Sequence, residues 1–268
     1  MKWAREAEEA VDRVPFFVRR RVRKRVEAEA ERQQAREVTL EHVQACKQKF
    51  LKQMEHEVKG HQVETCFGPE GCPNRAVQDS DLMKDLESLL ASKGLRKFLK
   101  KRVNGPLKLH HEFRVSISDC PNACSRPQIV DLGLIGATRP QVSAARCTGC
   151  GACVAICREE AIVLSEEGDE PLINSGKCLS CGQCISVCPT GALEADFSGY
   201  RILVGGKLGR RPQLAQELGG IYSGEEVLKV VDRCLDHYLT HSVAGERFGE
   251  ILKRTGFAML ESAAKHRD

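Results

Sequence analysis

Two cysteine runs, CTGCGACVAIC at residues 147–157 and CLSCGQCISVCP at residues 178–189, dominate the middle of this 268-residue chain. Both runs have the spacing C-x2-C-x2-C-x3-C. Closely spaced cysteines in a chain without an export signal bind metal more often than they form disulfides. A zinc ribbon needs only paired CxxC motifs, whereas each run carries a third and a fourth cysteine. The spacing therefore favours iron–sulfur clusters over zinc.

The doubled run resembles the bacterial two-cluster ferredoxin, in which three cysteines of one run share a 4Fe-4S cluster with the last cysteine of the other. Gly149, Gly151 and Gly182 allow backbone amides to approach the sulfurs. Arg158 stands where ferredoxins often have proline, and this departure removes no ligand. The resemblance implies two ligand sets, one of Cys147, Cys150, Cys153 and Cys188 and the other of Cys178, Cys181, Cys184 and Cys157.

Two further cysteine pairs have unusual spacings, a C-x5-C in ETCFGPEGCPNRA (residues 64–76) and a C-x3-C in ISDCPNACSRPQ (residues 117–128). This combination resembles the siroheme-4Fe-4S half-domain of the sulfite and nitrite reductase family. The resemblance extends to three more segments, DLGLIG (131–136), YRILVGGKLGRRPQLA (200–215) and GERFGEILKRTGF (245–257). An inserted ferredoxin after the C-x3-C segment is similar to the dissimilatory and anaerobic members of that family.

The family resemblance implies a third 4Fe-4S cluster, held by Cys66, Cys72, Cys120 and Cys124. In the family the last of these sulfurs also bridges to the siroheme iron, so Cys124 is the implied catalytic residue. A thiolate shared by two metal centres lets electrons pass one at a time into a substrate on the open face of the haem.

Basic residues are candidates for binding siroheme, because its eight carboxylates need compensating charge when they are buried. Lys207, Arg210 and Arg211 lie in the glycine-rich loop GGKLGRRP, and Arg126 and Arg75 lie beside cluster cysteines. One charge pair at about 4 Å is worth roughly 4 kcal/mol at an effective dielectric near 20, before desolvation is subtracted. The alternative interpretation of the loop is a basic surface turn without a cofactor.

The N-terminal residues 1–58 are polar, with valines at helical spacing and Thr39 as a candidate N-cap, and they predict a small helical module. The module resembles the C-terminal domain of the B subunit of light-independent protochlorophyllide reductase, which implies a role with a tetrapyrrole or in partner docking. A helical dimerisation arm and a tetrapyrrole carrier are the alternatives. Glutamates follow the basic run RRRVRKR (residues 19–25), which favours a solvated helix face over a nucleic-acid site.

These segments together predict an α+β fold of three parts. Residues 1–58 form the helical module, residues 59–140 and 197–268 form a sulfite-reductase-like α/β domain, and residues 141–196 form the inserted ferredoxin. We expect strands at residues 112–118 and 200–206. Two amphipathic helices are expected within residues 223–265, with Val227, Val231, Leu235 and Leu239 on one face of the first.

The pattern predicts a cytoplasmic protein without a transmembrane segment, because no long apolar run and no export signal are present. A net charge of +4 does not imply nucleic acid. One predicted function is an oxidoreductase related to sulfite and nitrite reductases, passing electrons from two ferredoxin clusters to a siroheme-coupled cluster. Complete sulfite reductases carry another lobe ahead of the C-x5-C pair, so a partner subunit or redox protein, in a homo- or hetero-oligomer, is expected. The alternative function is a three-cluster electron-transfer subunit without siroheme.

Overall fold

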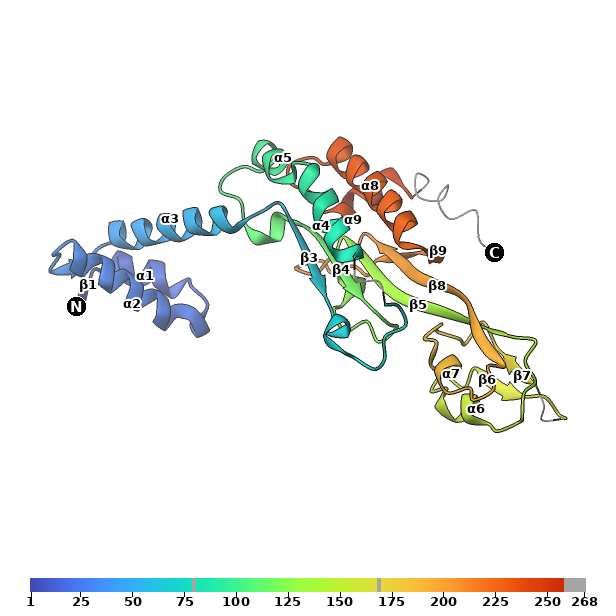
Figure 1. The fold of residues 1–268 in the computed structure, drawn as a ribbon. Helices are drawn as coiled ribbons and strands as arrows, with labels where there is room; N and C mark the ends of the chain where they lie inside the picture. The colour runs from blue at the N-terminus through green and yellow to red at the C-terminus, as the bar shows by residue number, and fades with distance from the viewer. Residues whose placement is uncertain (79–80, 168–169, 258–268) are drawn as a thin grey trace. The chain divides into compact units, whose positions relative to one another are not determined.

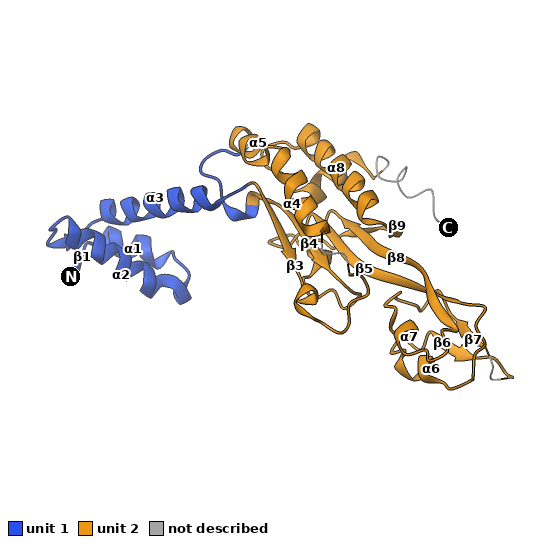
Figure 2. Ribbon diagram, in the orientation of Figure 1, with its two compact units in different colours: residues 1–59, 103–110 blue, residues 60–102, 111–268 orange. Residues whose placement is uncertain are grey.

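The computed structural model describes residues 1–78, 81–167 and 170–257, which fall into two compact units (Figure 1). Figure 2 colours the two units separately. The first combines Met1–Lys59 with Val103–His110, and the second contains the remaining residues. Helices and sheets are both present, which confirms the predicted α+β class.

Three helices build most of the first unit, and a short parallel pairing joins β1 (Lys2–Trp3) before the first helix to β2 (Glu37–Val38) before the third. The helices are α1 (Arg5–Asp12), α2 (Phe16–Arg32) and α3 (Leu40–Glu57). Pro15 caps α2, and the expected valine stripe is therefore divided between two helices, since proline breaks a helix interior. The core of this unit consists of Ala7, Val26, Ala30 and Val38.

Polar contacts fix the helices of the first unit. Thr39 caps α3 as predicted, in a reciprocal arrangement with His42. The indole Nε1 of Trp3 donates to Glu27 over 2.9 Å, and the Arg23 guanidinium lies 4.6 Å from the Trp3 ring centroid. These contacts join β1 to α2, so the one tryptophan of the chain is a structural anchor of the module.

A five-stranded mixed sheet forms the centre of the second unit, in the order β3-β4-β5-β8-β9. The strands are β3 (His61–Thr65), β4 (Phe113–Ser118), β5 (Leu132–Val142), β8 (Leu193–Val204) and β9 (Gln216–Tyr222). The first three run parallel, and β8 and β9 are antiparallel to their neighbours. A parallel pair needs a crossover connection, which α4 (Leu82–Ser92) and α5 (Leu95–Arg102) provide between β3 and β4.

Helices cover one face of this sheet and bury alternate strand residues. Val115 and Ile117 of β4 and Leu132 and Leu134 of β5 share one core with α4, α8 (Gly224–His241) and α9 (Phe248–Thr255). The two C-terminal helices were predicted, although residues 258–265 of the predicted range lie outside the described residues. Within this core burial raises the pKa of Cys234 to about 12, so that thiol acts as a packing group.

Strands β5 and β8 extend beyond their neighbours as a two-stranded ribbon that carries the cysteine-rich segment (Figure 1). Their pairing continues from Leu132–Val204 to Val142–Leu193, with a register shift between Arg139 and Pro140. Between the ribbon ends lie α6 (Ala152–Ile156), β6 (Ile162–Leu164), β7 (Pro171–Ile173) and α7 (Gln183–Ser186). Short 3-10 helices are η1 (Gly68–Glu70), η2 (Leu109–His111) and η3 (Pro127–Ile129).

Candidate iron–sulfur and siroheme site

The eight cysteines of the doubled run line two separate cavities. One cavity is lined by Cys147, Cys150, Cys153 and Cys188, and the other is lined by Cys157, Cys178, Cys181 and Cys184. Each cavity thus receives three thiols from one run and the last thiol from the other run. The structure therefore brings together the two groups of four that the ferredoxin resemblance implies.

Short helices that begin at left-handed glycines present these thiols. Gly151 precedes α6 with φ of 70°, and Gly182 precedes α7 with φ of 73°, a conformation that a residue with a Cβ rarely adopts. The turns that follow place Cys153 and Cys184 in a small core with Ile162 and Leu193. A helical turn after each glycine thus orients the third thiol of each run inward.

Backbone amides donate hydrogen bonds to several of these sulfurs, as expected around thiolate-bound clusters. The Gly149 amide donates to Cys147 Sγ over 3.4 Å, and the Ser180 amide donates to Cys178 Sγ over 3.4 Å. The Ala161 amide donates to Cys157 Sγ over 3.3 Å. Such donors stabilise negative charge on sulfur, so the donor set fits a thiolate-ligated cluster.

Burial, unlike these amide donors, disfavours the negatively charged form of the innermost thiols. Burial raises the pKa of Cys184 to about 11, and the nearby charges of Cys181 and Cys178 add to this shift. Burial also raises the pKa of Cys153. Both thiols are therefore protonated at neutral pH without a metal, and metal binding must supply the energy that releases their protons.

Two of the four remaining motif cysteines follow the carboxyl ends of the adjacent parallel strands β3 and β4. Cys66 follows β3 and Cys120 lies two residues beyond β4, and the Cys66 amide donates to the Ile117 carbonyl over 3.0 Å. Cys120 is buried, whereas Cys124 is exposed. Burial raises the pKa of Cys120, and the nearby charges of Cys124, Cys66 and Cys72 raise it further.

The Cys66 sulfur accepts two backbone hydrogen bonds, one from Gly68 and one from Asp119, each over 3.3 Å. Asp119 also holds the neighbouring segment, because its carbonyl accepts from the Ala76 amide over 2.8 Å. Its carboxylate accepts from Arg75 Nε over 2.8 Å. The C-x5-C and C-x3-C segments are therefore joined through Asp119, and the amide donors again fit a thiolate-ligated cluster.

Gly136 of β5 packs closely against the backbone of Asp119, the residue before Cys120. A Cβ at this position would stand 2.4 Å from the Asp119 carbonyl oxygen, which is backbone and cannot rotate away. We expect Gly136→Ala to shift the Asp119–Cys120 segment and to lower iron retention by the main-domain cysteines. Gly219→Ala in β9 is the matched control, because its Cβ would meet nothing within 4 Å. Iron and acid-labile sulfide per chain measure the effect, and equal loss in both variants would contradict the assignment.

The five basic candidates for siroheme binding divide into two groups. Lys207 is 8% exposed, and its Nζ donates to Glu250 over 2.6 Å, while Arg75 pairs with Asp119. The Lys207 bond lowers the pKa of the Glu250 carboxyl. Arg126, Arg210 and Arg211 are exposed. Lys207 therefore anchors its loop, and the cations that face solvent are the three arginines.

The basic loop is a short hairpin against the C-x3-C segment. Lys207 and Gln213 exchange backbone hydrogen bonds of 2.9 Å each, which leaves Leu208–Pro212 as the tip. The Ala215 amide donates to the Gln128 carbonyl over 2.8 Å. Arg210 and Arg211 are thus carried on a hairpin tied to the stretch of chain that follows Cys124.

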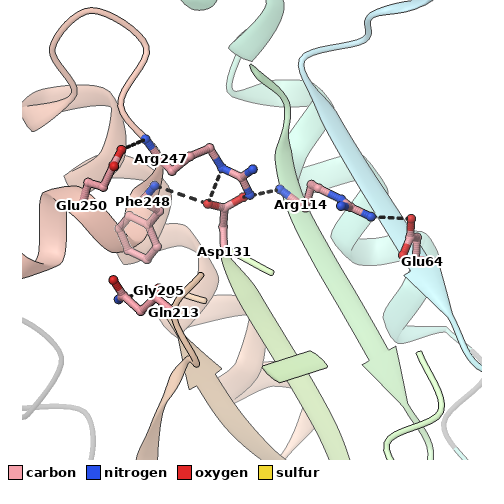
Figure 3. A network of polar contacts seen from close by, with 8 residues as sticks. All are labelled: Glu64, Arg114, Asp131, Gly205, Gln213, Arg247, Phe248 and Glu250. Atoms are coloured by element: carbon pink, nitrogen blue, oxygen red, sulfur yellow. Dashed lines mark hydrogen bonds and ion pairs between the residues drawn. The ribbon is translucent and has the colours of Figure 1, made fainter. Parts of the chain in front are cut away.

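A buried ion pair that sequence reasoning missed ties this region to the C-terminal helices (Figure 3). The Asp131 carboxylate, 1% exposed, accepts from Arg247 over 2.5 and 3.0 Å and from the Arg114 amide over 2.9 Å. The Asp131 carbonyl also accepts from the Gly205 amide over 2.8 Å. Asp131 and Arg247 both fall in segments that resemble the reductase family, and that resemblance was the available signal.

Three polar residues that join the cysteine-rich segment to the main sheet were also missed. Gln183 Nε2 donates to Asn74 Oδ1 over 2.8 Å. The Thr138 amide donates to the Ser180 carbonyl over 2.6 Å, and its hydroxyl donates to the Ala76 carbonyl over 2.6 Å. Nothing in the spacing of these residues predicts such contacts.

Over residues 1–78, 81–167 and 170–257, no helix is long and apolar enough to cross a membrane. The same residues hold no group of three His, Cys, Asp or Glu side chains placed to bind a single metal ion. A 4Fe-4S cluster spreads its ligands over four irons, so the second finding concerns mononuclear sites only.

Two family models match the chain. One, described as the nitrite and sulphite reductase 4Fe-4S domain, matches residues 59–267. The other, described as the proto-chlorophyllide reductase 57 kD subunit, matches residues 3–47. Both resemblances expected from the motifs are thereby confirmed.

Curated relatives are sulfite reductases. The coenzyme F420-dependent sulfite reductase of Methanocaldococcus jannaschii is 36% identical over 157 residues, which are 58% of this chain and 25% of that protein. A protein of Salmonella typhimurium that is named as a subunit of anaerobic sulfite reductase is 28% identical over 138 residues, 46% of this chain and 36% of that protein. The matched part thus spans about a quarter to a third of these relatives.

The fold also matches a solved structure. The crystal structure of dissimilatory sulfite reductase I superimposes with a TM-score of 0.53 at 19% identity, covering 82% of this chain and 57% of that one. At that identity the likeness concerns the fold alone.

Proposed function

Because the chain belongs to the nitrite and sulphite reductase 4Fe-4S domain family, we propose that it is a cytoplasmic sulfite or nitrite reductase subunit that carries electrons to a siroheme-linked centre. The observation that carries the proposal is the arrangement of twelve thiols in three groups of four. Two groups line cavities in the ferredoxin-like segment, and Cys120 of the third group lines one of those same cavities. Adjacent one-electron carriers are what a multi-electron reduction requires.

In this proposal each group of four thiols holds one 4Fe-4S cluster. Cys147, Cys150, Cys153 and Cys188 hold the first, Cys157, Cys178, Cys181 and Cys184 the second, and Cys66, Cys72, Cys120 and Cys124 the third. The amides of Gly68, Asp119, Gly149, Ala161 and Ser180 offset the charge of the thiolates. The proposed parts are residues 1–58, residues 59–140 with 197–268, and the insert 141–196.

Bound siroheme would supply an iron at which sulfite or nitrite is reduced. On this chain, Cys124 is the exposed thiol of its group and is the residue able to bridge outward to a second metal. Arg126, Arg210 and Arg211 are the exposed cations placed to pair with carboxylates. Lys207 and Arg75 position the surrounding loops through Glu250 and Asp119.

A second candidate function is a three-cluster electron-transfer subunit without siroheme. The pairing of Lys207 with Glu250 and of Arg75 with Asp119 favours it, because two of the five candidate cations already have partners within the chain. Both functions use the same three groups of thiols to hold the clusters. The two functions therefore predict the same number of cluster irons, and the first adds the tetrapyrrole with its own iron.

A partner subunit or redox protein is part of both proposals. One relative is named as a subunit of an anaerobic sulfite reductase, and the match covers 36% of that relative. The exposed position of Cys124 leaves its sulfur accessible to such a partner. We propose that the helical module, residues 1–58, provides contacts to a tetrapyrrole or to this partner.

Anaerobic purification followed by metal analysis and an absorption spectrum tests the proposal. We expect about twelve cluster irons per chain, four for each cluster, and about one more iron in siroheme, together with Soret and red-region siroheme bands. Full iron with no siroheme bands would select the electron-transfer subunit. Sulfite-dependent oxidation of a reduced dye by the isolated chain would exclude that second function. An iron content far below the expected value would contradict both functions.

A further inference from the structure

The two cavities of the ferredoxin-like segment differ in what lies beside them. The described residues that line the cavity of Cys147, Cys150, Cys153 and Cys188 all belong to that segment. The cavity of Cys157, Cys178, Cys181 and Cys184, about 90 Å³, also reaches Cys120, Pro121, Asn122 and Asn74 of the main domain. The second group of thiols is therefore the one adjacent to the main-domain cysteines.

Direct hydrogen bonds join the same loop of the second run to the main domain. Gln183 Nε2 donates to Asn74 Oδ1 over 2.8 Å, and Asn74 lies two residues after Cys72. Ser180, between Cys178 and Cys181, accepts from the Thr138 amide over 2.6 Å. Ser180 and Gln183 each lie between two cysteines of the second run, so these bonds fix the positions of the neighbouring thiols.

Thr138 connects this contact to the C-x5-C segment. Its hydroxyl donates to the Ala76 carbonyl over 2.6 Å and lies 2.8 Å from the Ser198 hydroxyl of β8. A Cβ at Gly182 would stand 3.1 Å from the Thr138 Cβ, so the glycine permits this close packing. One threonine thus contacts the second cysteine run, the segment after Cys72 and the ribbon.

The ribbon alone would hold the segment loosely. Its two strands shift register between Arg139 and Pro140, immediately after Thr138, and irregular two-stranded ribbons bend and twist readily. Electron transfer between centres weakens steeply as their separation grows. A direct contact between the cysteine-rich segment and the main domain, in addition to the ribbon, is therefore needed to keep two neighbouring centres at a constant separation.

Resting on the proposed function, we propose that the site of Cys157, Cys178, Cys181 and Cys184 is the relay next to the main-domain cysteines, and that Gln183 and Asn74 are the residues that position it. Thr138 supports the same contact from the ribbon. Cys147, Cys150, Cys153 and Cys188 then form the outer site. Gln183 and Asn74 act by holding the two thiol groups together, and neither residue binds a cluster.

Paired removal of thiols in the full chain tests the order of the sites. Cys181→Ala with Cys184→Ala removes the inner site, and Cys150→Ala with Cys153→Ala removes the outer site. Each variant should lose about four irons. In dithionite-reduced protein, electron paramagnetic resonance should show magnetic coupling between the two remaining centres only when the outer site has been removed. Coupling that survives loss of the inner site but disappears with the outer one would overturn the order.

Gln183→Leu tests the positioning role with all cysteines intact. We expect unchanged iron content, weaker coupling between the centres, and roughly five-fold faster hydrogen exchange at the Thr138 amide from loss of one hydrogen bond. Gln141→Leu is the matched control, because Gln141 donates to Glu194 across the exposed part of the same ribbon. Fully loaded Gln183→Leu protein that matches this control in coupling and exchange would overturn the positioning role alone. Wild-type protein without iron would instead overturn the proposed function, and the inference with it.

Discussion

Asp131→Asn is expected to lower the free energy of unfolding of the second unit by about 3 kcal/mol. Removing one partner of a buried ion pair leaves the other charge uncompensated, and such losses commonly reach about 3–5 kcal/mol. The side chain of Arg247 is 20% exposed, so solvent screens part of its charge and the expected loss lies at the lower end of that range. Asparagine preserves the size of the side chain and one acceptor oxygen, so the substitution isolates the charge.

The loss of stability should affect several helices and strands, because Asp131 joins chain segments that are far apart in sequence. Its carboxylate accepts from the amides of Arg114 in β4 and Phe248 in α9 as well as from the Arg247 side chain (Figure 3). Hydrogen exchange at Arg114 and Phe248 should accelerate together in the variant. Anaerobic urea unfolding followed by circular dichroism measures the total loss.

Glu64→Gln is the matched control for Asp131→Asn. Glu64 pairs with Arg114 Nη2 over 2.7 Å in the same network, but both side chains are 31% exposed. Solvent-screened pairs of this kind contribute about 0–1 kcal/mol, so this variant should be close to wild type. Equal destabilisation by the two substitutions would contradict the prediction that the buried Asp131 carboxylate contributes more to stability than the partly exposed Glu64 carboxylate.

Cys157→Ser and Cys188→Ser should each remove about four irons from the chain, and from opposite sites. Cys157 belongs to the first run in sequence but lines the cavity of Cys178, Cys181 and Cys184. Cys188 belongs to the second run but lines the cavity of Cys147, Cys150 and Cys153. Serine keeps the shape of the side chain and removes the soft sulfur ligand that iron–sulfur clusters select.

Alkylation followed by mass spectrometry identifies which thiols each substitution exposes. Cys157→Ser should free Cys178 and Cys181 for reaction and leave the exposed Cys150 protected, and Cys188→Ser should do the reverse. The raised pKa of Cys184 makes that thiol a poor reporter, since the thiolate is the reactive form. Labelling of Cys150 in Cys157→Ser would mean that each run keeps its own four ligands, and the crossed pairing would be wrong.

Local patterns were predictable from the chain because their causes are local. The valine and leucine spacing of α8 follows from helical geometry, and Thr39 caps α3 through contacts within one turn. The strand that leads to Cys120 was recognised from its alternating apolar residues. The family match over residues 59–267 confirmed the resemblance to the sulfite and nitrite reductase family that the cysteine segments predicted.

The positions of the charged candidates were not predictable, because each depends on residues distant in sequence. Lys207 is a siroheme-binding candidate from its loop alone, and nothing in the sequence indicated that its ammonium group donates to Glu250, which α9 brings to the loop. The Asp131–Arg247 pair depends on helices that close over the sheet after more than one hundred intervening residues. No spacing rule relates such partners.

The sequence by itself determined which residues are equipped for cluster chemistry, because thiol spacing and nearby glycines act within a few residues of chain. Only the tertiary structure decided which thiols share a cavity with Cys120 and which cations remain exposed. Those properties arise when β5 and β8 carry the cysteine-rich segment away from the sheet and Thr138, Asn74 and Gln183 fasten it to the main domain. The separation between the cysteine sites depends on how segments distant in sequence pack together, and only the tertiary structure determines that packing.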